Sequence, residues 1–242
     1  MKKIIPLIFL FILLISPQLE AVFFDSHNGE VVEGYAFDKG LSDGVITSGL
    51  REALTISTQK AVDSLSVENG YFDNPAVKIR VPEKVRTIAE DLRKIGFYKT
   101  VDEFERSMNR AVEMAAPMAT PIFISSIKEM AFDDARKILN GGDFAATEYF
   151  RKKASHRLYE TFKPMVSETL NQVKAAKKYK KMIENYAALI PFPETQIIDL
   201  DRYVAEKGID GFFLMMAEEE KKIRTDPVAR TTNLLKQVFG QS

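Results

Sequence analysis

Few residues of this 242-residue chain have the types and spacing that catalysis requires. Gly40-Leu41-Ser42-Asp43-Gly44 matches the string of a nucleophile elbow, in which a histidine activates the serine hydroxyl. That chemistry needs a strand before the serine and a helix after it, and no series of βα units surrounds the string. His156 is the only histidine downstream. We therefore predict that Ser42 or Asp43 caps a helix. A hydrolase is the least favoured of three functions, after a binder of an apolar ligand and a structural or interaction module.

The metal-binding residue types are equally sparse. His156 lies four residues before Glu160, a spacing that can bind a metal when further ligands are present, and none stands out. Asp133-Asp134 and the pair Asp199 and Asp201 do not continue into a twelve-residue calcium loop, and helix capping explains them. The chain has no cysteine, so disulfides and thiolate chemistry are excluded. We predict no catalytic residue, no metal site and no cofactor.

The apolar side chains allow a different kind of site. All methionines after Met1 lie in segments that we expect to be helical, where flexible thioethers fill irregular cores but also suit a pocket for an acyl chain. The run Phe212–Met216 is apolar on every side of its turn, which is typical of a buried segment or a cavity wall. The residues predicted to line an apolar ligand site are Met114, Met118, Phe212, Phe213, Met215 and Met216.

The charges of the chain are balanced, with 34 basic and 34 acidic residues. This balance argues against nucleic-acid binding, which requires a basic excess facing the phosphates. Lysines gather in one place, and a solvated helix face is the simplest explanation, with contact to anionic lipid headgroups as the alternative. The members of this basic cluster are Lys174, Lys177, Lys178, Lys180 and Lys181.

The elements that would position these residues are mainly helical. From residue 44 to residue 240, apolar residues recur at three- and four-residue spacing, which predicts one all-α domain, a bundle of about seven to nine helices. In segment 74–82, apolar and basic residues alternate between two prolines. This alternation breaks the helical pattern and indicates an extended stretch. Helix kinks or breaks are expected at Pro117, Pro121 and Pro164.

Two helix starts have sequence signals. Thr100 and Glu103 have the spacing of a capping box, which predicts a helix that begins at Thr100. Asp226-Pro227 combines a cap with a favoured first residue, which predicts a final helix that runs to about Phe239. That helix is expected to bury Phe239 although it lies close to the end of the chain.

The first 43 residues differ from the rest. Lys2 and Lys3, twelve apolar residues (4–15) and a polar stretch ending at Ala21 form the pattern of a secretory signal peptide, predicted over residues 1–21 with cleavage near Ala21. A membrane anchor is the alternative, although twelve residues are short for a bilayer. Residues 22–43 are predicted to be irregular, as a loose tail or, less favoured, as a small hairpin around Asn28-Gly29.

Several segments in fixed order resemble the DUF4197 family of exported bacterial proteins. The resemblance covers roughly Leu50 to Gly240 and depends on four stretches, which are Asn74–Pro82, Asp133–Asp143, Ala217–Arg224 and Asp226–Gly240. It implies a helical, envelope-directed domain and no particular activity. Some members carry a lipid-modified cysteine after the signal, and this chain has none.

These observations together predict an exported, periplasmic or envelope-associated protein without catalytic activity. The expected partner is a lipid or another apolar ligand, and a closed apolar cavity would favour that function. The alternative is a structural or interaction module that binds another envelope protein, for which a solid core and an exposed patch are expected.

Overall fold

The computed structural model describes residues 40–129, 131–133, 135–189 and 198–240, with the backbone of residues 23–24 and 31–32. The predicted signal peptide, residues 1–21, lies outside these described residues, as does most of the segment 22–43. The chain divides into two compact units, residues 1–40 and 41–242, which are described separately.

The first unit contains two short strands. β1 (Phe23–Phe24) pairs antiparallel with β2 (Val31–Val32), with Phe23 opposite Val32. These are the strands of the hairpin that the sequence analysis ranked below a loose tail. The residues between the two strands, 25–30, lie outside the described part of the chain.

The second unit is an all-α domain, as predicted, with eight α-helices and two short 3-10 turns among its described residues. The helices are α1 (Asp43–Leu65), α2 (Arg86–Lys94), α3 (Tyr98–Glu129), α4 (Ala135–Leu139), α5 (Ala145–Gln172), α6 (Ala175–Ala187), α7 (Leu200–Thr225) and α8 (Asn233–Phe239). The 3-10 turns are η1 (Glu83–Val85) and η2 (Pro227–Ala229).

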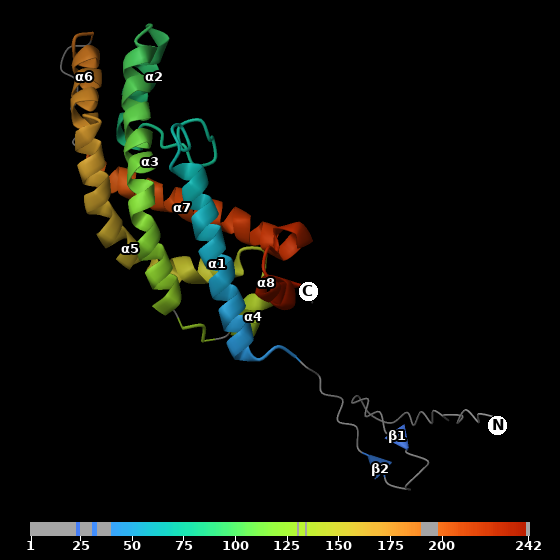
Figure 1. The fold of residues 1–242 in the computed structure, drawn as a ribbon. Helices are drawn as coiled ribbons and strands as arrows, with labels where there is room; N and C mark the ends of the chain where they lie inside the picture. Colours follow the sequence, from blue (N-terminus) through green and yellow to red (C-terminus); the bar gives the residue numbers. More distant parts are fainter. Residues whose placement is uncertain are drawn as a thin grey trace. The chain divides into compact units, whose positions relative to one another are not determined.

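The helices pack in two directions. α1 and α3 lie side by side, and α7 crosses them, while α2 and α6 flank the first half of α3 (Figure 1). α5 packs on both α3 and α7. At the centre, Phe123 contacts the rings of Phe150, Phe212 and Phe213 with centroids 5.3 to 6.1 Å apart. Large buried side chains of this kind each contribute roughly 1.5–3 kcal/mol, so this aromatic cluster is a main source of stability.

The helix ends agree only in part with the sequence signals. Ser42 caps α1 by accepting a hydrogen bond from the amide of Val45 at 3.3 Å, as predicted. The prediction for α3 is wrong by two residues, because this helix begins at Tyr98 and Thr100 bonds to Asn185 instead. The final helix also starts later than predicted, after a cap by Thr232, because the Asp226-Pro227 signal opens η2.

The three helical prolines are accommodated without dividing their helices. Pro117 and Pro121 lie inside α3, and Pro164 lies inside α5. All three side chains face solvent, where water can satisfy the carbonyl groups that lose their amide partner. The described part of the chain therefore keeps two long helices, of 32 and 28 residues, as the scaffold of the core.

Candidate functional site

The residues considered for catalysis are not brought together. Ser42 is used as a helix cap at the start of α1, whereas His156 is exposed on α5. His156 borders an open hollow with Ser155, Glu206 and Asp210, whereas Ser42, the serine of the elbow string, does not line it. Among the described residues, no group of three or more acidic or histidine side chains could hold a metal ion.

The six residues predicted to line an apolar ligand site lie in different surroundings. Three of them, Phe212, Phe213 and Met216 of α7, are buried in the core of the domain, where the two phenylalanines belong to the aromatic cluster. Met114 and Met215 are half-buried, and Met118 is exposed. None of the six lines any of four prominent solvent-open hollows of the described residues, which measure about 300 to 680 Å³.

An unpredicted feature is a row of buried polar side chains on α3. Glu105, Asn109 and Glu113 follow one another at four-residue intervals, so they share one face of the helix. Glu105 Oε1 accepts from the amide of Val81 at 3.1 Å, and Glu113 Oε1 accepts from the amides of Tyr71 and Phe72 at 3.1 and 3.3 Å. The row replaces a neighbouring strand, because it supplies hydrogen-bond partners to a segment that is neither helix nor sheet.

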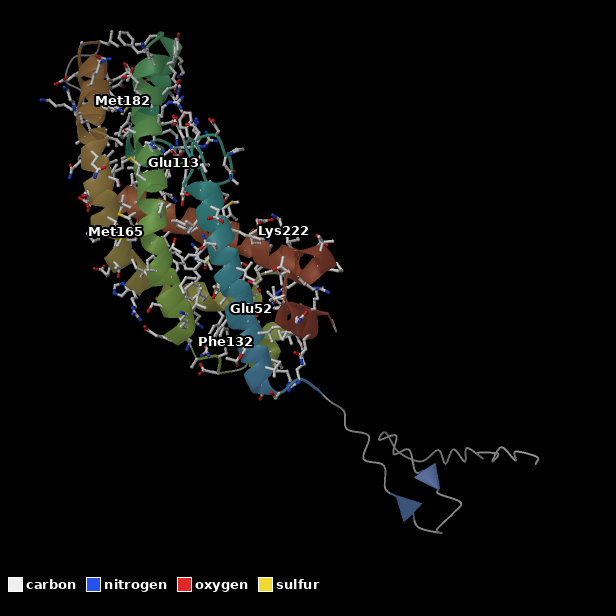
Figure 2. All side chains as sticks on the ribbon, in the orientation of Figure 1. Glu52, Glu113, Phe132, Met165, Met182 and Lys222 are labelled. Carbon is white, nitrogen blue, oxygen red and sulfur yellow. The ribbon has the colours of Figure 1, made fainter. Side chains whose placement is uncertain are left out.

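This segment, residues 71–81, is named here the clamped segment. It follows the end of α1, and Glu113 is labelled in Figure 2 where α3 faces it. Its first residue, Tyr71, donates its hydroxyl to the carbonyl of Gly208 on α7 at 2.8 Å. Burial and the nearby Glu113 raise the pKa of Tyr71 well above its usual value, so the hydroxyl stays protonated and remains a donor.

A glycine permits the close approach of the clamped segment to α7. A Cβ added to Gly211 would lie 2.7 Å from the ring of Tyr71 and 3.3 Å from Val77, so no larger residue fits without movement. The sequence signal for the polar row on α3 is the Glu-x-x-x-Asn-x-x-x-Glu spacing in an otherwise apolar helix face. That spacing identifies the row only once this face of α3 is known to be buried.

The clamped segment forms one wall of a hollow of about 330 Å³, named here the basic groove. α7 also contributes to its lining, as does Arg86, the first residue of α2. The cationic side chains that line it are Lys78, Arg80, Arg86 and Lys207, and the only carboxylate in the lining is Asp210. Tyr203 donates its hydroxyl to the carbonyl of Arg80 at 3.0 Å, and burial raises the pKa of this tyrosine. The apolar part of the lining includes Val77, Val81 and Leu214.

A second buried polar group joins three helices. Glu220, fully buried on α7, accepts from the amides of Ala146 and Thr147 at 2.9 and 2.7 Å and so caps α5. Arg224 donates to Glu220 at 2.8 Å and to the last carbonyls of α4, Ile138 and Leu139, at 3.1 and 2.7 Å. These contacts give Glu220 and Arg224 a structural role, because each of the two satisfies backbone groups at a helix end.

The end of the bundle formed by the α2–α3 turn and the last turn of α6 is unusually apolar on its surface. The exposed fractions there are 53% for Ile95, 39% for Phe97, 62% for Tyr98 and 47% for Leu189. These four side chains, named here the apolar tip, are half of the eight large apolar side chains exposed in the described residues.

The geometry of the turn holds the apolar tip together. Gly96 adopts a φ of 92°, and the amides of Gly96 and Phe97 bond back to the carbonyls of Arg93 and Leu92 in a Schellman motif. Asn185 donates to the hydroxyl of Thr100 at 3.1 Å, which joins α6 to the start of α3. Because α3 leads away from this end and α6 leads toward it, the α2–α3 turn and the end of α6 lie at the same end of the bundle (Figure 1).

Basic residues lie in the turn of the apolar tip. The turn carries Arg93, Lys94 and Lys99, of which Arg93 pairs with Asp102 and Glu105 and Lys94 pairs with Asp91 at 3.1 Å. The basic cluster of the sequence analysis lies on the first half of α6 and the turn before it, whereas Leu189 follows the end of this helix. Lys178 is half-buried, and the exposed members of the cluster are Lys174, Lys177, Lys180 and Lys181. Lys180 pairs with Glu184 at 3.6 Å, which is the single acidic residue of residues 174–189.

Comparison with known proteins identifies the family of this fold. The sequence model of the family described as "Protein of unknown function (DUF4197)" matches residues 40–240. The chain belongs to the DUF4197 family. The match covers all eight helices and therefore includes the clamped segment, the basic groove and the apolar tip of this DUF4197 protein. No curated protein and no solved structure matches the chain.

Among the described residues of this DUF4197 protein, no helix combines the length and the apolar character needed to cross a bilayer. Half of the exposed large apolar side chains of these residues lie at the apolar tip, and the other four are Val67, Met118, Leu214 and Val228.

Proposed function

We propose that this DUF4197 protein is a non-catalytic, exported protein of the cell envelope that docks on an anionic membrane surface through its apolar tip. The observation that carries the proposal is the gathering of Ile95, Phe97, Tyr98 and Leu189 at one end of the bundle, beside an excess of lysine. Exposed apolar side chains on a rigid turn are costly in water and mark an interaction surface.

The chemistry of the tip matches a lipid interface. Tyrosine is enriched where membrane meets water because its ring is apolar and its hydroxyl is wet, and Ile95, Phe97 and Leu189 can enter the acyl boundary. Each lysine close to an anionic surface adds up to about 1 kcal/mol of attraction. Lys94 and Lys99 lie directly beside the apolar side chains, so both terms act at the same place.

The interior supports a surface function over an internal ligand. The predicted ligand-lining residues Phe212, Phe213 and Met216 are occupied by contacts with other core side chains. The lipid-like partner expected from the sequence is therefore proposed to be the membrane itself. A protein of the envelope is the second candidate, because Phe97 and Tyr98 are also of the types that anchor protein interfaces.

Vesicle binding tests the docking proposal. We expect the full chain to sediment with vesicles that contain phosphatidylglycerol and less with vesicles of phosphatidylcholine alone. The variant F97S/Y98S/L189S should lose most of this binding, whereas V228S, which removes an 85% exposed valine far from the tip on η2, should keep it. All variants share one N-terminus, so differences between them report on the tip.

Charge variants separate a membrane from a protein partner. K94Q/K99Q should weaken binding to anionic vesicles and reduce its dependence on salt, whereas K152Q on α5 should have no effect. Equal sedimentation of the wild type and the tip variant would contradict membrane docking. Capture of one envelope protein by the wild type but not by the tip variant, without vesicle binding, would establish the second candidate instead.

Export is tested separately. The protein isolated from its native host should begin at or near Val22 and should fractionate outside the cytoplasm. N-terminal sequencing that returned Met1 or Lys2 would overturn this part of the proposal. It would leave the docking test unaffected, because the apolar tip belongs to the family domain.

A further inference from the structure

We propose that the basic groove is a binding site for a phosphate group, carried by a small phosphate ester or by the headgroup of a phospholipid. The groove lies between the clamped segment and α7 and is separate from the apolar tip. Its volume of about 330 Å³ is at the lower end of the range for small-molecule sites. A phosphate site in this groove would give the protein a second binding function, in addition to the membrane docking proposed for the apolar tip.

The charge of the groove favours an anion. Four cationic side chains line it against the single carboxylate of Asp210, and that carboxylate is already engaged by Arg151 and, at 3.8 Å, by Lys207. Arg86, the first residue of α2, pairs with Glu83 on the preceding 3-10 turn. Among the described residues no carboxylate pairs with Arg80, whose side chain is exposed toward solvent. The groove therefore has cationic capacity that the protein itself does not neutralise.

The walls of the groove are held in place before any ligand binds. Ile79 and Val81 alternate with the groove residues Lys78 and Arg80, and both are tied to α3 through their backbone amides. Tyr203 fixes the carbonyl of Arg80 from the side of α7. The ammonium group of Lys78 lies 3.6 Å from the ring centre of Phe72, which orients it without neutralising it. The backbone that carries Lys78 and Arg80 is therefore fixed before a ligand binds, which lowers the ordering cost of binding.

Phosphate fits this arrangement better than a carboxylate. Arginine presents a planar fork that binds two phosphate oxygens, and lysine adds point charges around the same group. Arg80, Arg86 and Lys207 all line the groove, so a phosphate bound there would be offered donors from the clamped segment, α2 and α7. The apolar side chains of Val77, Val81 and Leu214 would contact a short carbon chain attached to it.

The test measures binding of named probes to the full chain. Inorganic phosphate, glycerol 3-phosphate and dihexanoyl-phosphatidylglycerol below its micellar concentration are titrated, with phosphorus NMR and calorimetry as readouts and glycerol as the neutral control. We expect saturable binding of at least one phosphate probe. R80Q/K207Q should weaken it at least about tenfold, and the matched variant K152Q should leave it unchanged.

The outcomes are distinct from those of the docking test. Binding of glycerol 3-phosphate identifies a soluble ester, whereas binding of the lipid alone identifies a headgroup, and either supports the site. Because the side chains changed are exposed, thermal unfolding of R80Q/K207Q should match the wild type, which verifies that the fold is intact. Absence of saturable binding, or equal weakening by K152Q, would overturn the proposal. The tip variant F97S/Y98S/L189S should bind phosphate normally, so the two proposals fail independently.

Discussion

Asn109 binds both polar groups of the Ile79 backbone. Its Oδ1 accepts from the Ile79 amide at 2.8 Å, and its Nδ2 donates to the Ile79 carbonyl at 2.8 Å, as a neighbouring strand would. Both residues are buried, so water cannot replace either bond. The clamped segment is therefore held by a side chain that imitates a peptide group.

Replacing Asn109 with alanine should be costly. The change leaves the amide and the carbonyl of Ile79 buried without partners, each at about 1–3 kcal/mol, so we expect a loss of about 2–4 kcal/mol in the free energy of unfolding. Urea denaturation measures it. N171A, at an exposed position on α5, is the matched control and should change stability by less than about 0.5 kcal/mol. Similar losses in both variants would show that the clamp has no special importance.

The buried pair of Glu220 and Arg224 should be sensitive to the loss of one partner. R224M keeps much of the side-chain volume but leaves the charge of Glu220 uncompensated in the core, which we expect to destabilise the fold by about 3–5 kcal/mol. Chemical denaturation measures the effect. R202M removes the exposed pair with Glu206 and should cost no more than about 1 kcal/mol. An equal effect of the two substitutions would contradict the role assigned to burial.

The contact between α1 and α8 predicts an unusual glycine effect. Alanine normally stabilises a helix interior by about 1 kcal/mol relative to glycine, but a Cβ at Gly49 would lie 2.6 Å from Val238. Because overpacking costs about 1–3 kcal/mol, G49A should destabilise the protein, with a lower melting temperature. G44A, where the nearest atom to the new Cβ is 3.9 Å away, should not.

A double mutant distinguishes this clash from other causes. V238A makes room for the new methyl group, so G49A should cost less in the V238A background than alone, with an interaction energy of about 1 kcal/mol. Additive effects of the two substitutions would mean that α8 does not pack on α1 as described. The same result would argue against the burial of Phe239, which the structure places in the core.

The stability of the protein should depend on the ionisation of Glu219. Burial opposes this ionisation, but hydrogen bonds from Lys222 and Lys60 outweigh burial and lower the pKa of Glu219 below its ordinary value of 4.5. A lowered folded-state pKa means that the carboxylate stabilises the fold above pH 4.5 and that this contribution is lost as the pH falls through the folded-state pKa. E219Q should therefore be less stable than the wild type at pH 7, with a smaller difference at pH 3.

Urea unfolding at the two pH values measures this dependence. E218Q, at an exposed neighbouring position on α7, is the control. Its difference from the wild type in the free energy of unfolding should not shrink comparably between pH 7 and pH 3. A stability difference for E219Q that stayed constant between pH 7 and pH 3 would refute the assignment. The outcome does not depend on any ligand, because all three side chains belong to the fold.

Local signals were enough to predict the fold class and several helix ends. Ser42 and Asp199 act as caps where their residue types and positions indicated, since a cap depends only on the next three residues. The apolar periodicity predicted an all-α domain correctly, because a helix face must be buried whatever its neighbour is. The capping-box spacing at Thr100 failed, since α3 already begins in the tight turn at Gly96.

Tertiary packing decided everything that depends on residues distant in the chain. The alternation of 74–82 indicated an extended segment, but only the fold shows that Glu105 and Asn109 bind it and that Lys207 faces it across a groove. The composition of the apolar run 212–216 predicted a ligand site, but the fold buries Phe212, Phe213 and Met216 in the core. The surface sites arise because the fold packs α6 on α2 and α3, and places Lys207 and Arg80 in the lining of one groove, across separations that no local pattern encodes.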